Sequence, residues 1–419
     1  MRLTDNLSRY KTPLNFLNSV LFNNGIALVT SFFTYRYIAP EYLGIWGTFT
    51  VFSTIATFLR LGIPNGMNRQ LPFYLGKGDV KKAESYASTT LSYSYFTMLI
   101  MSIIAVAFLL TNSFSSKGDL ALAYKWAAIV FFVQIIIDPF STYLSGTFRT
   151  SSNFDKLSII QYLNGAYKLI SVIFVALWGY AGFLIREVVA FLLNASLLFF
   201  YRPMPHIKAR FEWSVFKDLF NIGFSIFIVS YISTFIDTIP RLFIVRNGTS
   251  LDMGLFSPSL IILGLVALIP NTLSNYLYPK FSYACGEGVS RLYYWNMTKK
   301  MLIASLGLGL MAALLVFFLI DYVIIVFPKY FDALPYIKMT CFAMAFIGYK
   351  LTDVSCVVLK EWKWLWIRLI IYGVSIVSSI FLLQLIIDDI ISIAVFSIAI
   401  TNVLQYISSF LIIYVISHK

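Results

Sequence analysis

The sequence predicts an all-α integral membrane protein with about twelve transmembrane helices in two six-helix bundles. Hydrophobic residues make up 59% of the 419 residues and charged residues 12%, and the mean hydropathy is +0.79. These values lie far from those of soluble proteins. Apolar runs of about 20 residues, long enough to cross a bilayer, recur along the whole chain and leave no soluble domain of useful size. A third observation, an internal repeat, divides the runs into two sets of six.

The apolar runs give the expected spans in order. They cover residues 14–38, 43–73, 85–110, 120–148, 157–178, 181–201, 215–237, 253–278, 301–320, 334–359, 365–387 and 390–416. The first run is too long for the apolar region of a signal peptide and lacks a small-residue cleavage site, so we expect it to span the membrane.

The distribution of lysine and arginine predicts the orientation of the spans. If residue 1 is cytoplasmic, the basic residues of the inner segments outnumber those of the outer segments by about three to one. Such a bias marks the cytoplasmic side, which places both termini there. The net charge of +13 is therefore explained by topology and does not call for a nucleic-acid partner.

Two stretches, one in each half, carry the same features at nearly the same spacing. Gly44 corresponds to Gly254, and the Ile-Pro-Asn that contains Pro64 corresponds to the one that contains Pro270. Pro72 and the inner loop at 76–79 correspond in the same way to Pro279 and the loop at 286–288. The offset contains six spans, an even number, so both copies enter the membrane from the same side. This predicts a parallel repeat with halves 1–205 and 206–419, as in transporters built around a central cleft.

The paired prolines predict two broken helices. Proline inside a helix removes one backbone hydrogen bond, and the freed groups persist in a membrane only where they pack in protein or line a wet cavity. We therefore expect the bends at Pro64 and Pro270 to face the cleft between the two bundles.

Ionisable residues within the spans are costly, at about 3 kcal/mol for a charge at the bilayer centre, so each needs a reason. Basic groups predominate over acidic ones. Arg60 and Lys168 have no acidic residue three or four positions away, and such cations suit an anionic diphosphate. The remaining charges within spans are Asp138, Arg186, Glu187, Lys350 and Asp353.

Each of these other charges also has a structural interpretation. Lys350 and Asp353 are three residues apart and are expected to pair on one helix. Arg186 lies near enough to the expected outer surface to reach water. Asp138 precedes Pro139 and is placed to bond the freed backbone there. Lys350 and Arg186 stay candidates for substrate binding, and Asp138 and Asp353 for coupling or gating.

Polar residues within the spans form a second set of candidates. Asn23 and Asn24 on the first span are expected to contact a sugar, although asparagine also joins membrane helices to one another. Asp237 and Arg241, on either side of Pro240, predict a gate or a coupling-ion site. Others of this kind are Asn15, Asn18, Tyr93, Tyr95, Gln134, Gln161, Tyr162, Asn164 and Tyr167.

Signatures of catalysis and of cofactors are missing from the sequence. It contains no GxxxxGK[ST] loop to cradle a nucleotide, and its two histidines support no Ser/His/Asp set. Cys341 and Cys356 are roughly 22 Å apart on one helix at 1.5 Å per residue, too far for a disulfide. We expect no cofactor, no metal site and no enzyme activity.

The glycine-led loop, the proline-bent second span and the inner "LGKGDVKKAESY" resemble the O-antigen type of polysaccharide flippases. These belong to the multidrug/oligosaccharidyl-lipid/polysaccharide exporter superfamily. The resemblance covers essentially the whole chain and is strongest over residues 15–87. It implies alternating-access transfer of an undecaprenyl-pyrophosphate-linked oligosaccharide, of the O-antigen or capsule type, from the cytoplasmic to the outer leaflet of the bacterial inner membrane.

The resemblance also implies roles and partners. In the related lipid II flippases, basic residues at the position of Arg60 contact the pyrophosphate, and an acidic residue on the helix of Asp237 serves sodium. Partners would be membrane lipids, a coupling proton or sodium ion, and polysaccharide assembly proteins.

Two other functions stay open on the sequence. A drug or cation antiporter shares the expected fold, but its site would show acidic groups facing cations. An O-antigen polymerase should carry a large outer loop, whereas the longest candidate here, residues 321–335, has about fifteen residues.

Overall fold

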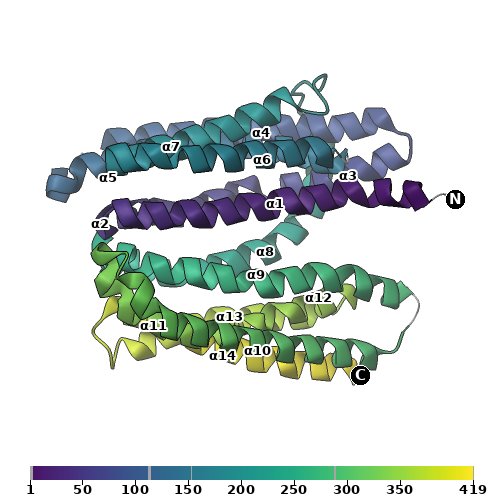
Figure 1. Cartoon of the computed structure of the whole chain (residues 1–419). Helices are drawn as coiled ribbons and strands as arrows, with labels where there is room; N and C mark the ends of the chain where they lie inside the picture. Colours follow the sequence, from purple (N-terminus) through teal and green to yellow (C-terminus); the bar gives the residue numbers. More distant parts are fainter. Residues whose placement is uncertain (1–2, 112–114, 152, 287–288, 419) are drawn as a thin grey trace. The chain divides into compact units, whose positions relative to one another are not determined.

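A computed structural model describes residues 3–111, 115–151, 153–286 and 289–418, and in this part of the chain all regular structure is helical (Figure 1). The first seven helices are α1 (Leu3–Tyr37), α2 (Pro40–Thr57), α3 (Ile63–Gly76), α4 (Val80–Thr111), α5 (Ala121–Thr150), α6 (Phe154–Ile170) and α7 (Val172–Phe200). The next seven are α8 (Trp213–Asn247), α9 (Ser250–Gly286), α10 (Arg291–Ile324), α11 (Leu334–Ala345), α12 (Leu351–Val358), α13 (Trp362–Leu383) and α14 (Ile390–Ser417). Four short 3-10 helices join them: η1 (Phe58–Arg60), η2 (Ser115–Leu120), η3 (Pro328–Ala333) and η4 (Ile347–Lys350).

The helices form two compact units, and two of the three boundaries between them fall inside helices. Unit 1 comprises Met1–Ile38 and Phe52–Tyr231, and unit 2 comprises Ala39–Val51 and Ile232–Lys419. The first part of α2 therefore belongs with the C-terminal helices, and α8 is shared between the units. The division into halves 1–205 and 206–419 rests on the repeat in the sequence and stays a prediction.

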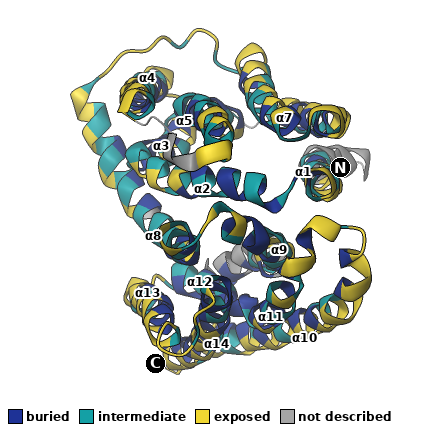
Figure 2. Cartoon of the chain, turned by 90° about the vertical axis from the view of Figure 1, so that its left-hand side faces the viewer, coloured by how far each residue is buried: buried dark blue, intermediate teal, exposed yellow. Residues whose placement is uncertain are grey.

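Unit 1 packs α3, α4 and α5 around one apolar core, and α6 pairs with α1 along its length. Its core contains Ile63, Met67, Tyr86 and Phe148, each at most 2% exposed. The outward faces of α4 and α7 are largely exposed, as Figure 2 shows in yellow. A soluble protein would bury such a face, and a membrane helix turns it to lipid.

Unit 2 packs α9 to α14 around a second core and adds the first part of α2 through a close helix crossing. A Cβ atom on Gly44 would lie 1.6 Å from the Ser250 carbonyl oxygen, and one on Gly254 would lie 1.9 Å from the Pro40 carbonyl oxygen. Only glycine fits where two backbones approach so closely. The two glycines that the repeat aligns thus lie in the same crossing.

The break in the second span is made by two residues in the left-handed region and not by proline. Leu61 has φ 46° and Gly62 has φ 75°, and Pro64 lies in the first turn of the helix that follows. Proline suits this position because the first turn needs no donor. The expected break at Pro270, the counterpart of the one at Pro64, was wrong, because α9 continues as one helix through Pro270. Both prolines are buried.

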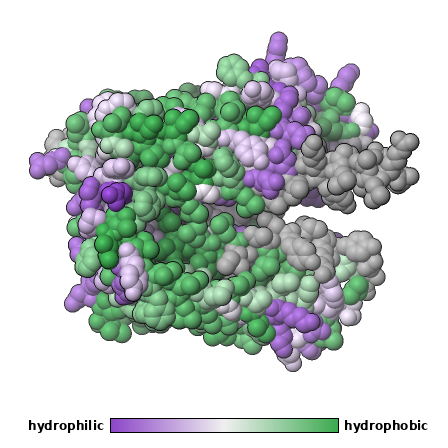
Figure 3. Space-filling view, in the orientation of Figure 1, coloured by the Kyte–Doolittle hydropathy of each residue, from purple (hydrophilic) through white to green (hydrophobic). Residues whose placement is uncertain are grey.

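The helices have the length and hydropathy of membrane spans. In the described residues nine helices meet both criteria, and ten do if the bent pair Pro328–Ala345 and Ile347–Val358 is one span. The expected spans at α1, which carries five asparagines, and at α6, which has 17 residues, are not among them. Figure 3 shows hydrophobic residues along the helices and hydrophilic ones gathered near their ends. The chain is a multi-pass membrane protein.

Of the two inner loops that the repeat aligns, residues 287–288 lie outside the described part of the chain.

Candidate functional site

A seam of polar side chains runs between α1 and α6 in unit 1, and we call it the α1–α6 seam. Its centre is Asn23, whose Nδ2 donates to Gln161 Oε1 at 2.6 Å and whose Oδ1 accepts from Lys168 Nζ at 3.1 Å. Tyr162 donates to Asn15 Oδ1 at 3.4 Å, about two turns from Asn23 along α1. The seam forms because Gly165 lets the helices approach: a Cβ there would lie 2.8 Å from the Phe22 ring.

Lys168 is the basic residue of this seam. Its ammonium bonds an amide oxygen, and none of the carboxylates in the described residues lies within 4 Å of it. An ammonium group offers three donors, and the amide oxygen accepts one of them. The charge is thus held in place by a neutral partner and stays available to an anion.

Arg60 has an acidic partner that helical spacing did not predict. Its guanidinium forms an ion pair with Asp138 of α5, 78 positions away in the sequence. Asp138 therefore bonds the side chain of Arg60, whereas the sequence placed it beside the backbone freed by Pro139. The Nε of Arg60 is buried and has no hydrogen-bond partner, so one donor remains.

Arg186 is buried in unit 1 and does not reach water, contrary to expectation. It is 9% exposed, forms an ion pair with Glu187 at 2.8 Å and donates to Thr34 Oγ1 at 2.9 Å. Its guanidinium also lies 4.9 Å from the centre of the Phe183 ring. These contacts join α7 to α1 and favour a structural role. Asn24, by contrast, is exposed.

Unit 2 contains a cavity of about 190 Å³ with an acidic residue, Asp237, in its wall. Lys350 Nζ lies 3.4 Å from Asp237 Oδ2, and the Tyr372 hydroxyl donates to Oδ1. Tyr349 donates in turn to the Tyr372 oxygen at 3.1 Å. Arg241 lines the same cavity, and its buried Nε has no partner. The cavity thus combines one carboxylate, two cations and two phenols within apolar walls.

The expected pair of Lys350 with Asp353 was wrong. Asp353 instead forms an ion pair at 2.6 Å with Arg368 of α13, which is 2% exposed and also donates to Gln405 at 3.3 Å. Lys350 ends the short helix η4 while Asp353 lies on α12, so the two side chains are not on one regular helix.

Sequence reasoning missed several members of these clusters. Arg368 lies near the start of the expected span 365–387, where a basic residue carries no special signal. Tyr372 and Asp218 carried no signal of their own, yet Asp218 accepts from Tyr86 and, at 3.2 Å, from Gln70. Such partners come from different helices and have no characteristic spacing.

The sequence of this chain matches one known protein family. The family model described as "Polysaccharide biosynthesis protein" matches residues 15–284, more than half of the chain. No curated protein sequence shows a significant match.

Solved transporter structures share the fold. A multidrug resistance MATE family transporter of the MOP superfamily, in its inward-facing conformation, gives a TM-score of 0.73 at 16% identity, covering 94% of each chain. Its outward-facing conformation gives 0.65 at 15% identity, covering 97% of this chain and 96% of that one. The lipid II flippase MurJ, inward closed, gives 0.68 at 13% identity, covering 96% and 90%.

These likenesses establish the architecture, and the family match adds the biological context. The neighbours are described as transporters and a flippase. The chain belongs to the polysaccharide biosynthesis protein family.

Proposed function

We propose that the chain is a flippase that moves an undecaprenyl-pyrophosphate-linked oligosaccharide from the cytoplasmic to the outer leaflet by alternating access. The observation that carries this proposal is Lys168, a cation within the α1–α6 seam that is bonded to the Asn23 amide oxygen. A diphosphate is the anionic part of such a cargo, and charge-assisted hydrogen bonds are its strongest contacts. Arg60, with one unused donor, is the second candidate.

The charges of the spans favour this cargo over a cationic drug. The acidic residues Asp138, Glu187, Asp237 and Asp353 each form an ion pair with a basic residue. A cation exporter needs a carboxylate that its cargo can neutralise. In this protein an arginine or a lysine already neutralises each of these carboxylates.

The test is transfer of a lipid-linked oligosaccharide in proteoliposomes that contain the Lys168→Gln variant. Losing one charge-assisted hydrogen bond should slow transfer by roughly tenfold or more. Lys168→Arg should retain more activity because it keeps the charge. Lys156→Gln is the matched control, because Lys156 is an exposed residue of the same helix.

Unchanged transfer by Lys168→Gln would show that this cation does not handle the cargo. Efflux of a cationic dye by the parent, abolished by the same substitution, would instead favour the antiporter.

We also propose that Asp237 couples transport to an ion gradient, since it lines a cavity together with Lys350 and Tyr372. Lys350 already places a cation beside the Asp237 carboxylate. This favours a proton over sodium as the coupling ion. Asp237→Asn should abolish the stimulation of transfer by an imposed pH gradient. Stimulation by a sodium gradient alone would contradict the proton assignment.

A further inference from the structure

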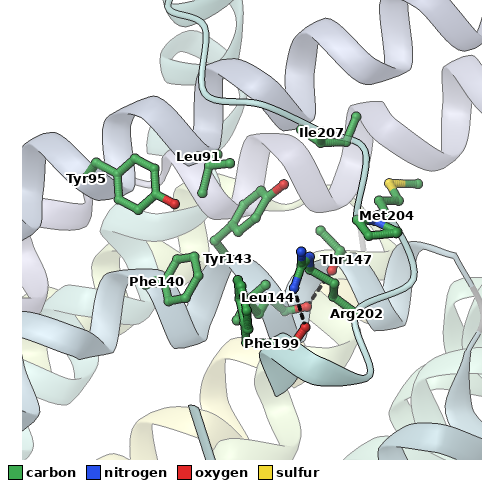
Figure 4. A pocket seen from close by; sticks show the side chains of 11 residues that line it. Leu91, Tyr95, Phe140, Tyr143, Leu144, Thr147, Phe199, Arg202, Met204 and Ile207 are labelled. Atoms are coloured by element: carbon green, nitrogen blue, oxygen red, sulfur yellow. Dashed lines mark hydrogen bonds between the residues drawn. The ribbon is translucent and has the colours of Figure 1, made fainter. Parts of the chain in front are cut away.

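A second pocket lies in unit 1, away from the α1–α6 seam. It is formed by α4, α5, the end of α7 and the loop that follows α7, and it encloses about 170 Å³ (Figure 4). We call it the Arg202 pocket. Arginine is its one charged lining residue, and no carboxylate lines it. The pocket is therefore electropositive.

Arg202 is held in place and keeps unused hydrogen-bond donors. Its Nη1 donates to the Phe199 carbonyl oxygen at 2.7 Å, and its guanidinium stacks 3.8 Å from the centre of the Phe199 ring. None of the carboxylates of the described chain forms an ion pair with it. Because a guanidinium carries five N–H donors, most of them remain available to a ligand.

Tyr143 provides a second, independent indication of a ligand. The residue is 3% exposed and lines the pocket, and no hydrogen bond of its hydroxyl is found among the described residues. The hydroxyl is not among the fully buried polar atoms that lack a partner, so it is open to the pocket and can donate to a ligand there. Figure 4 shows Tyr143 and Arg202 lining the same pocket, with Tyr95 stacked on Phe140 beside them at 5.8 Å.

The pocket lies where a membrane span ends. The apolar helix α7 ends at Phe200, and Arg202 follows two residues later. Large apolar side chains that directly follow lining residues in the sequence are exposed, among them Phe96 at 56% and Phe200 at 79%. A lipid would therefore meet a cation at its headgroup and apolar side chains along its chains.

We propose that the Arg202 pocket binds the phosphate of an anionic membrane phospholipid. The guanidinium of Arg202 and the hydroxyl of Tyr143 donate to the phosphate oxygens, while Phe140 and Tyr95 contact the glycerol region. A volume of about 170 Å³ suits a headgroup phosphate, whereas drug-sized ligands occupy pockets of about 300 Å³ or more. The inference does not depend on the cargo proposed above.

The test compares phosphatidylglycerol with phosphatidylcholine of the same acyl chains, added to the purified full-length protein in detergent and measured by native mass spectrometry. The parent should bind phosphatidylglycerol more tightly. Arg202→Gln should weaken that binding by roughly tenfold or more, the effect of one lost charge-assisted hydrogen bond. Tyr143→Phe should weaken it severalfold and leave the thermal midpoint without lipid unchanged. Lys208→Gln, an exposed charge of the same loop, should bind like the parent.

Three results would overturn the proposal. Equal weakening by Arg202→Gln and Lys208→Gln would show that only the overall charge of the loop attracts the lipid. Unchanged binding by Tyr143→Phe would remove the hydroxyl from the site, and this variant remains informative if Arg202→Gln does not fold. Displacement of phosphatidylglycerol by a lower concentration of a short-chain polyprenyl diphosphate would assign the pocket to the cargo instead.

Discussion

At the scale of single residues, two ion pairs inside this protein join partners that are distant in sequence. Arg60 pairs with Asp138 and Lys350 with Asp237, 78 and 113 positions apart. An ionised group in low dielectric is stable only when it is paired and hydrogen-bonded. Each pair therefore ties two helices together, which gives the pairs measurable effects on stability.

The buried Arg368 gives the first prediction. Asp353→Asn should lower the free energy of unfolding by about 3–5 kcal/mol, because it leaves a buried guanidinium without a counter-charge. The measurement is denaturant unfolding in micelles. Glu361→Gln breaks the more exposed pair with Arg291 and should cost only about 0–1 kcal/mol. Equal losses in the two variants would contradict the assignment.

A double-mutant cycle tests which acid is the partner of Lys350. Lys350→Gln and Asp237→Asn should be coupled by about 0.5–3 kcal/mol in unfolding free energy, the range for residues in direct contact. The cycle of Lys350→Gln with Asp353→Asn should show a smaller coupling. A larger value for the second cycle would restore the pairing that the sequence suggested.

At the scale of helices, close crossings depend on glycine. Gly44→Ala should destabilise unit 2 by about 1–3 kcal/mol, because its Cβ would overlap the Ser250 carbonyl and force α2 away from α9. Gly307→Ala is the control: nothing lies within 4 Å of its Cβ, so removing backbone freedom should stabilise α10 by about 0.5–1 kcal/mol. Thermal unfolding in micelles would separate the two, and equal midpoints would refute the crossing.

The sequence predicted helices well and their interruptions poorly. Apolar runs locate the spans because length and hydropathy are local properties, and the expected run at 390–416 matches α14 within one residue. The break at Leu61 was not predictable, since leucine rarely adopts a positive φ and nothing local marks it. Pro270 has the same motif as Pro64, yet α9 continues through it as one helix.

The candidate site was predictable only by residue type. The α1–α6 seam contains Asn23, Gln161 and Lys168, all of which the sequence marks as polar residues within spans. Their contact across two helices, like the ion pair of Arg368, depends on tertiary packing. Helical spacing does not encode such contacts.

At the scale of the whole molecule, two helices each belong to both units. The boundaries fall at 51/52 in α2 and at 231/232 in α8. Thr50 and Ser230 lie beside them and donate to carbonyls three residues back, at 2.7 and 2.9 Å. Side-chain bonds of this kind compete with the helix and favour bending. Each of these helices therefore carries such a side-chain bond beside the point where it passes from one unit to the other.

The last prediction follows from this arrangement. Thr50→Val combined with Ser230→Ala should slow transport in proteoliposomes while leaving the thermal midpoint close to that of the parent. Ser102→Ala removes a similar bond inside α4, within one unit, and should leave the rate unchanged. Equal rates in all three proteins would show that bending at these points does not limit transport.

The assignment of residues 39–51 to unit 2 also has a consequence for biosynthesis. Gly254 follows Gly44 by 210 residues. At a synthesis rate of about 5–20 residues per second, the glycine face of residues 39–51 stays uncovered for roughly 10–40 s, until α9 has been synthesised. During that time, lipid or a membrane chaperone must shield it. A ribosome that stalls before α9 therefore leaves an uncovered helix face that marks the nascent chain for quality control.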